Sequence, residues 1–413
     1  MATTPKYSVK VVVGDTTYNV DGVLTDLKLD EHSKQFAQIA TIQLVNILHN
    51  GKYLTSIFDV IDEVYVTATY DGVTDEVFRG YIWTDDYRSS DDKYIELKCY
   101  DNLIFPQKSE ICEYFTAGKT TDAIIQTLCD KWGVKTNYQY KTISHPKLPL
   151  EGNLMDVLTA DVLDEVKKQT GVKYVIRSNK GVVDIKTVGT NSKIYEIRSK
   201  KNSGRVRHMT TMDEVVTQVI ITGKTDDDER TPIEATVKGD TNRYGTIQKR
   251  ISKSEDTSLE ESKQEAQEML DENGTPKETI EITQSADIPF VHKGDIVLVS
   301  SGDIVERYCL VLAVTHNATR KTMDLELEFF DMPASDESAS GGNTAAGTEL
   351  KLSGVPLYKS SDISTKSTTV SGTYYLYDGI EVNGRYRITN TKSRVGAKPV
   401  GHNVTGWIDK ENV

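Results

Sequence analysis

The chain has 413 residues, more than one hydrophobic core usually organises, so two to four domains are expected. Hydrophobic residues make up 37% and charged residues 27%, as in folded soluble proteins, and no apolar run is long enough for a membrane span. Lys and Arg number 49 against 62 Asp and Glu, and the net charge of −13 disfavours binding to nucleic acid or anionic lipid.

Residues 1–110 are expected to form a β-barrel domain. Five short segments are rich in β-branched and aromatic residues, and turn residues separate most of them. In the last segment Ile95, Leu97 and Cys99 alternate with polar residues, which predicts a strand with one face in water. The segments are 7–13, 38–45, 64–70, 77–83 and 94–100.

Residues 111–204 are expected to form a small α+β domain. One helix is predicted between Thr120 and Gly133, and a second is predicted to end near Gly171, because apolar residues recur at helical spacing. Short strands are predicted at 172–176 and 182–188. The apolar helix positions are Ile125, Leu128, Cys129 and Trp132, then Met155, Leu158, Val162 and Val166.

Residues 205–333 are expected to form a second β-barrel domain that one helix interrupts. Ser258 and Glu261 have the spacing of a capping box, and Gly274 is expected to end this helix. The predicted strands of the domain are 215–222, 279–283, 295–299, 308–315 and 323–330.

The last part of the chain differs in composition from the rest. Residues 334–350 are predicted to be a flexible linker, because 334–348 contain no large apolar residue. Residues 351–413 are predicted to be a small β domain, in which Asn383-Gly384 suits a hairpin turn. This segment carries a net charge of 9 − 5 = +4, against 10 − 18 = −8 in residues 1–110.

An internal repeat relates residues 62–101 to residues 295–331. The first begins DEVYV and ends IELKCYD, whereas the second begins DIVLV and ends LELEFFD, so that Ile95 aligns with Leu325. Two interpretations remain open: a chance likeness between three-stranded meanders, or a duplicated β-barrel that encloses the α+β domain. In a three-fold trimer, two barrels per chain would make a ring of six similar barrels.

No motif for catalysis, cofactor binding or metal binding is found. Gly118-Lys119-Thr120 and Gly223-Lys224-Thr225 lack the earlier glycine of a phosphate-binding loop. The acidic run 226–229 lacks the pattern of a calcium loop, and the seven histidines have no ligand spacing. We therefore expect no cofactor and no enzyme activity. The cysteines have no CxxC spacing and are expected to be buried and reduced; they are Cys99, Cys112, Cys129 and Cys309.

Several segments in order resemble the XkdQ/YqbQ type of phage-tail protein, over roughly residues 5–333. The resemblance implies the baseplate hub of a contractile tail or tailocin: two tube-type β-barrels with an α+β insertion, a homotrimer, and a place between tail tube protein and central spike protein. It implies no catalysis in this part of the chain. The matching segments are FRGYIWTDDYRSSDDKYIELKCYD, AGKTTDAIIQTLCDKWGV, VVTQVIITGK, YGTIQKRI, HKGDIVLV and CLVLAVTH.

The last domain resembles bacterial SH3-like modules in the segments VPLYKSSD, TYYLYDG, VNGRYRIT and VTGWID. Such modules often bind cell-wall peptide or glycan, so aromatic side chains are candidates for a ligand surface facing peptidoglycan. The alternative is that they fill the core of a small barrel. The candidates are Tyr374, Tyr375, Tyr377, Tyr386 and Trp407.

The leading hypothesis is a structural hub that joins a six-fold tail tube to a three-fold spike. It would contact other baseplate proteins and would be assembled in the bacterial cytoplasm into a phage or phage-tail-like particle. One alternative is a cell-wall hydrolase with a targeting module, but a catalytic motif is missing. Another is an adhesin, but an export signal is missing. A subsidiary hypothesis is that four carboxylates line the lumen of the barrel, where they would keep DNA from sticking as it passes. The alternative is that they lie on an outer turn. They are Asp85, Asp86, Asp91 and Asp92.

Overall fold

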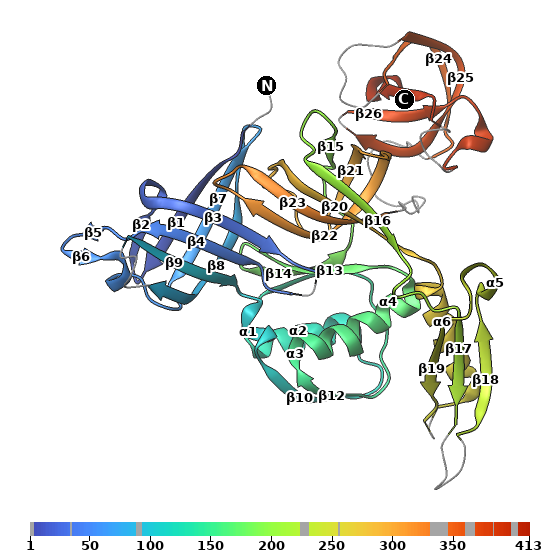
Figure 1. The fold of residues 1–413 in the computed structure, drawn as a ribbon, viewed down its shortest axis with the longest axis horizontal. Helices are drawn as coiled ribbons and strands as arrows, with labels where there is room; N and C mark the ends of the chain where they lie inside the picture. The colour runs from blue at the N-terminus through green and yellow to red at the C-terminus, as the bar shows by residue number, and fades with distance from the viewer. Residues whose placement is uncertain are drawn as a thin grey trace. The chain divides into compact units, whose positions relative to one another are not determined.

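The computed structural model describes residues 4–33, 35–87, 93–223, 231–254, 257–330, 346–359, 368–382, 384–397 and 404–413. Strands dominate, as predicted (Figure 1). The chain divides into two compact units, one comprising Met1–Val206 and Glu281–Val413 and the other Arg207–Ile280. Predicted features that lie wholly or partly outside the described residues include the Asn383-Gly384 turn, the linker 334–350, Gly223-Lys224-Thr225, the acidic run 226–229, and Asp91 with Asp92.

The largest sheet has 13 strands in the order β16-β20-β23-β22-β3-β4-β9-β8-β7-β1-β2, with β21 between β22 and β15. We call β1–β9 the first β domain and β15, β16 and β20–β23 the second β domain. The first comprises β1 (Lys6–Val13), β2 (Thr16–Asn19), β3 (Leu24–Glu31), β4 (Ile39–Val45), β5 (Leu48–His49), β6 (Lys52–Tyr53), β7 (Glu63–Tyr70), β8 (Val73–Tyr87) and β9 (Tyr94–Asp101). The second comprises β15 (Tyr195–Arg198), β16 (Arg205–Thr211), β20 (Lys277–Ala286), β21 (Ile296–Ser301), β22 (Ile304–Asn317) and β23 (Thr322–Phe329).

The repeat extends beyond the two meanders to six strands in each domain. The order β3-β4-β9-β8-β7-β1 in the first matches β16-β20-β23-β22-β21-β15 in the second. The outermost pair differs, because β1 is antiparallel to β7 whereas β15 is parallel to β21. Each meander has one register shift in each of its two hairpins. The shifts lie at Val66/Thr67 and Ile82/Thr84 in the first domain and at Val299/Ser301 and Val311/Ala313 in the second.

The register shifts are β-bulges, and their matching positions correct the sequence alignment of the third strand of each meander. Ile82 pairs with Cys99 just before a bulge, and Val311 pairs with Leu327 just before the equivalent bulge. Cys99 therefore corresponds to Leu327, two residues earlier than the alignment of Ile95 with Leu325 implies. A slip of two residues keeps every side chain on its face of the strand, so the sequence pattern cannot detect it.

Alternation of buried and exposed residues explains why these segments form strands, and β4 and β9 follow it almost throughout. The apolar faces of the first domain pack into one core that includes Val9, Ile42, Val64 and Leu97. The two predicted barrels are joined into one sheet, because the end of β22 pairs with β3. Closure of either domain into a barrel is not among the pairings of the described residues.

The insertion between the β domains is α+β, as predicted. The second predicted helix is continuous through α3, η3 and α4, and it ends at Gly171, whose φ of +69° suits a helix end. Cys112 is exposed on β10, contrary to the expectation of buried thiols, because it points away from the core-facing residues. The elements are α1 (Ile104–Gln107), β10 (Glu110–Phe115), α2 (Thr121–Lys131), β11 (Thr136–Gln139), β12 (Leu148–Asn153), α3 (Leu154–Val157), η3 (Leu158–Leu163), α4 (Asp164–Thr170), β13 (Tyr174–Asn179) and β14 (Val182–Thr187).

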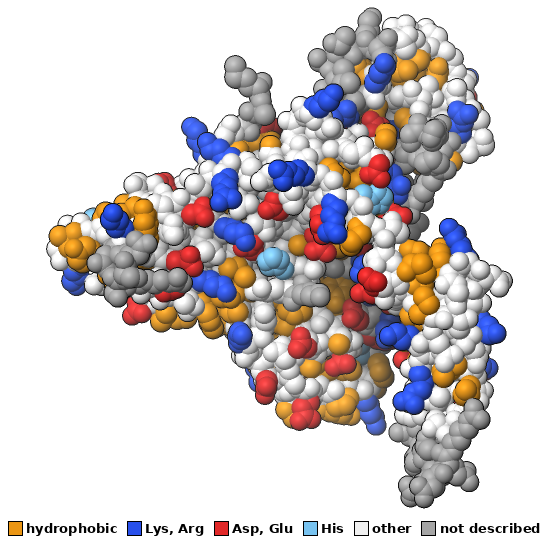
Figure 2. Space-filling view, viewed as in Figure 1, with side chains coloured by type: hydrophobic (Ala, Val, Ile, Leu, Met, Phe, Trp, Pro, Cys, Tyr) orange, Lys and Arg blue, Asp and Glu red, His pale blue; other side chains and the backbone are white. Residues whose placement is uncertain are grey.

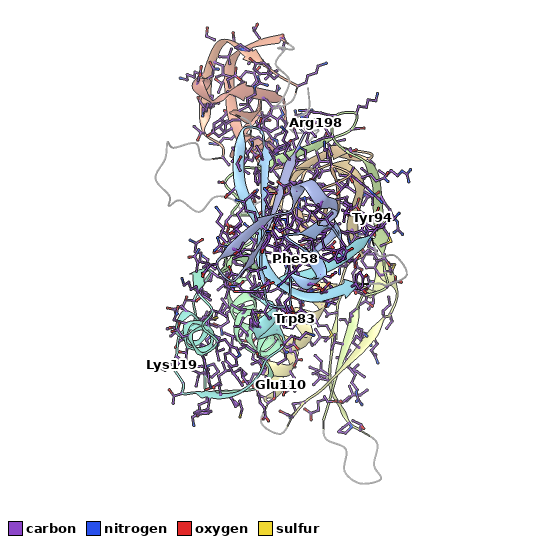
Figure 3. The ribbon with its side chains drawn as sticks, turned by 90° about the vertical axis from the view of Figure 1, so that its left-hand side faces the viewer. Phe58, Trp83, Tyr94, Glu110, Lys119 and Arg198 are labelled. Atoms are coloured by element: carbon purple, nitrogen blue, oxygen red, sulfur yellow. The ribbon has the colours of Figure 1, made fainter. Side chains whose placement is uncertain are left out.

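The insertion is packed on the first domain through aromatic side chains. Trp83 of β8 lies edge-on to Tyr100 and Phe105, with ring centroids 6.1 and 5.9 Å away. Figure 3 shows Trp83 on the side of the first domain that faces the helices. These rings join the hydrophobic core of the insertion, so the two parts share buried surface.

The unit Arg207–Ile280 has its own three-stranded sheet, in the order β18-β17-β19, and helix α6. Segment 215–222, predicted as a strand of the second barrel, is β17 of this separate sheet. Its Val219 and Ile221 pack with Ala266 and Leu270 of α6. Strand periodicity indicates a buried face but not which sheet the strand joins. The elements are β17 (Gln218–Thr222), β18 (Ile233–Lys238), α5 (Thr241–Tyr244), β19 (Gln248–Ser252) and α6 (Leu259–Asn273).

Replacing Ser258 by alanine is expected to destabilise α6 by about 1 kcal/mol. The Ser258 hydroxyl accepts a hydrogen bond from the Glu261 backbone N–H, and the Glu261 carboxylate accepts one from the Ser258 N–H, which completes the predicted capping box. Hydrogen exchange of the α6 amides measures the effect. Exchange in the first turn of α6 that stays at the wild-type rate would contradict the prediction.

The C-terminal module, residues 346–413, has a four-stranded antiparallel sheet, β24-β25-β26-β27. A bridge between Tyr358 and Trp407 brings the segment after β24 beside β27, so the sheet curls back on itself. The strands are β24 (Glu349–Leu357), β25 (Thr368–Val382), β26 (Arg385–Thr389) and β27 (Gly406–Asp409).

Candidate functional site

A buried carboxylate joins the two β domains. Glu31, at the end of β3, is 5% exposed, and its carboxylate lies 2.7 Å from His292 Nδ1 and accepts the Lys293 backbone N–H at 3.1 Å. Burial by itself raises the pKa of Glu31, but His292, Arg177 and Lys293 outweigh it and lower the pKa to about 2. The carboxylate is therefore ionised at neutral pH and held by partners far away in the sequence.

The insertion contributes a cation to the same place. Arg177 of β13 binds Asp295 at 3.1 Å, with both side chains largely buried. Asp101, 1% exposed at the end of β9, accepts backbone N–H groups from Gln38 and Leu103, and burial raises its pKa to about 7. A polar cavity of about 40 Å³ lies between these groups, which is room for a few water molecules.

A second buried pair lies within the second β domain, and Tyr7 of the first domain binds it. His316 and Asp287 are 1% and 2% exposed, and His316 Nδ1 lies 2.7 Å from the Asp287 carboxylate. His316 Nε2 lies 3.0 Å from the Val291 carbonyl, so both ring nitrogens face acceptors. Burial lowers the pKa of His316, but Asp287 outweighs it and raises the pKa. Tyr7 of β1 donates its hydroxyl to the same carboxylate at 2.6 Å.

These contacts define a junction that holds three parts of the chain in one arrangement. Charges buried in pairs tolerate little displacement, because separating them leaves a charge without compensation. In the part of the chain that the structure describes, no group of three His, Cys, Asp or Glu side chains could hold a metal ion. None of the described helices has the length and apolar character needed to cross a membrane.

A second junction fixes the C-terminal module to the second β domain. Arg387 of β26 is 1% exposed and binds Asp378 at 2.8 Å. Its guanidinium lies between the rings of Tyr308 of β22 and Trp407 of β27, 4.6 and 4.7 Å from their centroids. A buried cation between two aromatic faces is a strong and specific contact. Ile296 and Leu298 of β21 complete the apolar part of this junction.

The repeat shows that the second domain is adapted to carry the module. Leu298 pairs with Tyr308, and the equivalent pair in the first domain is Tyr65 with Arg79. Arg79 stacks on the Tyr65 ring at 5.0 Å, binds Glu76 and lines the polar cavity beside β13. The second domain has apolar or aromatic side chains at these positions because the module covers them.

The structure places the five predicted ligand residues in two groups. Tyr377, Tyr386 and Trp407 are 3%, 9% and 0% exposed, so they occupy the interior, as in the core-filling alternative. Tyr374 and Tyr375 of β25 are partly exposed. Trp407 lies within the junction with the second β domain, which the sequence did not indicate. Binding of cell-wall peptide or glycan by the module stays a prediction.

Sequence reasoning missed the polar residues of both junctions. Glu31 and His292 lie 261 positions apart, and neither belongs to a motif. Strand β3 itself was not predicted, because Asp and Lys interrupt its leucines. One signal was available: Leu27 and Leu29 alternate with polar residues before Glu31, and both are buried.

Two solved structures share this fold. The 43 kDa tail protein of prophage MuSo2 from Shewanella oneidensis has a TM-score of 0.56 at 14% identity, over 78% of this chain and 98% of that protein. The tail protein from Neisseria meningitidis MC58 has a TM-score of 0.55, also at 14% identity, over 78% and 96% of the two chains. The fold is therefore shared with these two tail proteins.

Sequence comparison defines the family. The YQBQ-like family model matches residues 38–328, which is more than half of the 413 residues. The chain belongs to the YQBQ-like family, in agreement with the resemblance found in its sequence. A curated relative is the phage-like element PBSX protein XkdQ of Bacillus subtilis strain 168, 23% identical over 228 residues, which cover 54% of this chain and 68% of the relative.

Proposed function

We propose that the protein is a structural component of a phage or phage-tail-like baseplate, a trimeric hub that joins a six-fold tail tube to a three-fold spike. The duplication of a six-strand β domain carries the proposal. Three chains with two such domains each offer six similar positions on one side while the assembly keeps three-fold symmetry. Membership of the YQBQ-like family and the phage-like element origin of XkdQ support a tail role.

The chemistry of the junctions suits a part that transmits force. The contacts of Glu31 with His292 and of Tyr7 with Asp287 hold the two β domains at a fixed spacing. A hub that takes up the motion of a contracting tail must keep this spacing, so the proposed role is mechanical and not catalytic. In this role the chain is assembled in the bacterial cytoplasm and contacts the tube, the spike and other baseplate proteins.

The purified full-length chain is expected to sediment at three chain masses and to form rings with six-lobed projections in negative stain. Mass in solution and class averages are measured on the same sample. A three-chain particle without six lobes would contradict the hub geometry. A chain that is monomeric at about 100 μM would contradict self-assembly into a trimer.

A further inference from the structure

Two loops occupy the same place in the two β domains. One connects β4 to β7 and the other connects β20 to β21. At the start of the first, the Asn46 N–H donates to the Lys93 carbonyl at 2.7 Å; at the start of the second, the Asp287 N–H donates to the Lys321 carbonyl at 3.1 Å. The loops therefore leave equivalent strands at equivalent residues.

The ends of the loops also correspond, bond for bond. We call residues 57–62 the tip loop and residues 290–295 the junction loop. The N–H of Ile61 donates to the Ile82 carbonyl at 2.7 Å, and that of Gly294 donates to the Val311 carbonyl at 2.8 Å. The N–H of Asp59 donates to the Asp62 carboxylate at 2.8 Å, and that of His292 donates to the Asp295 carboxylate at 3.0 Å.

Within the chain, the junction loop binds the first β domain. His292 and Lys293 hold Glu31 of β3, and Phe290 lies edge-on to Tyr70 of β7 at 6.5 Å. The Lys293 ammonium also donates to the backbone carbonyls of two residues that follow β3. None of the six junction-loop residues is exposed.

The tip loop presents apolar side chains to solvent at the same positions. Val60, in place of Lys293, and Ile61, in place of Gly294, are both 51% exposed. Ile61 has a φ of +73°, a conformation that is strained for a β-branched residue, whereas Gly294 adopts a φ of +86° without that strain. Figure 2 shows hydrophobic side chains gathered at the end of the first domain that carries β5 and β6. A strained, exposed isoleucine indicates a surface that another molecule covers.

The tip loop lacks the cation of the junction loop, because Val60 stands in place of Lys293. Asp59 stands where His292 stands in the second domain. Among the described residues, Asp85 of β8 has a buried carboxylate oxygen without a hydrogen-bond partner. Burial raises the pKa of Asp85, and Asp59 and Asp86 raise it further. This acidic and apolar surface requires a partner with cationic side chains.

The second β domain has the complementary charge in the equivalent strand. Within the chain, the junction loop binds beside β3, whose sequence LTDLKLDE is acidic. The counterpart of β3 in the sheet order is β16, whose sequence RVRHMTT carries two cations, Arg205 and Arg207, and no carboxylate. Within the chain, the cationic junction loop contacts the acidic strand β3. The acidic tip loop has a basic strand, β16, as the equivalent of β3 in the second domain.

We propose that the tip loop of one copy binds the second β domain of another copy, beside β16, as the junction loop binds the first β domain within one chain. The partner is therefore a second copy of this protein, joined head to tail. Every chain offers one tip loop and one β16, so contacts of this kind continue around a closed ring. The inference rests on the proposed hub function and names the surface that joins its subunits.

Two substitutions in the full-length chain test the proposal. Val60→Glu places a charge in the apolar contact and is expected to weaken self-association at least ~10-fold. Ile61→Gly removes apolar surface and relieves strain, so it is expected to weaken self-association while the melting temperature stays unchanged or rises. Leu48→Glu is the matched control: Leu48 is 60% exposed on the β5–β6 hairpin, an addition that the shorter junction loop lacks. Sedimentation equilibrium measures association, and scanning calorimetry measures folding.

The expected pattern is weaker association for Val60→Glu and Ile61→Gly and wild-type association for Leu48→Glu. Trimers of wild-type affinity in both tip-loop variants would overturn this contact but leave the hub proposal standing. Equal weakening by Leu48→Glu would overturn the equivalence between the two loops. A wild-type chain that never associates would overturn this contact and trimer formation together.

Discussion

Replacing Glu31 by alanine is expected to lower the free energy of unfolding by about 3–5 kcal/mol at neutral pH. The Glu31 carboxylate is buried between β3 and the junction loop, where it binds His292 and the Lys293 N–H. Without it, buried cationic groups lose their counter-charge and a hydrogen-bond donor loses its acceptor. Urea unfolding followed by circular dichroism measures the change.

The contribution of Glu31 is expected to depend on pH with a definite sign. The pKa of Glu31 is about 2 in the folded chain, below its ordinary value of 4.5. The folded state therefore favours the ionised form, and the resulting stabilisation is present above about pH 4.5 and is lost as the pH falls toward 2. Glu31→Gln keeps an acceptor without the charge and should lose less stability between pH 5 and pH 3 than the wild type does.

An exposed ion pair provides the comparison for Glu31. Glu260 binds Lys263 at 2.7 Å within α6, and its side chain is 82% exposed. Glu260→Gln is expected to leave stability unchanged, because water compensates an exposed charge. A loss for Glu31→Ala no larger than that for Glu260→Gln would show that the junction does not depend on this charge.

Replacing Arg387 by alanine is expected to destabilise the C-terminal module by about 3–5 kcal/mol and to release it from the second β domain. The substitution leaves Asp378 without its cation and opens a gap between the rings of Tyr308 and Trp407. Burial raises the pKa of Asp378, and Arg387 opposes this effect without reversing it. Loss of Arg387 therefore removes the main group that stabilises the ionised carboxylate. Hydrogen exchange of β26 and β27 should rise, while that of β4 and β9 stays unchanged.

Two further variants separate the charge of Arg387 from its stacking. Arg387→Lys keeps the charge but loses the planar group that lies between two rings, so an intermediate effect is expected. Arg394 is exposed on the same module, and Arg394→Ala should leave exchange unchanged. Protection of β26 and β27 that survives Arg387→Ala would show that apolar contacts alone hold the module.

The sequence was sufficient for features that depend on local periodicity. Alternation in residues 94–100 predicted β9, and the capping pair Ser258 and Glu261 predicted the start of α6. The likeness of residues 62–101 to 295–331 predicted two related meanders, which the strand pairing confirms. Such patterns are readable because each residue's face follows from its spacing to near neighbours.

The tertiary structure decided which surfaces meet. Periodicity placed Trp407 on a strand, but only the folded chain shows that it is buried against Arg387 and the second β domain. The sequence likewise assigned β17 to the wrong sheet and left Glu31 unnoticed. A buried face can pack on any apolar partner, and a charge can pair across hundreds of residues, so these choices depend on the whole chain.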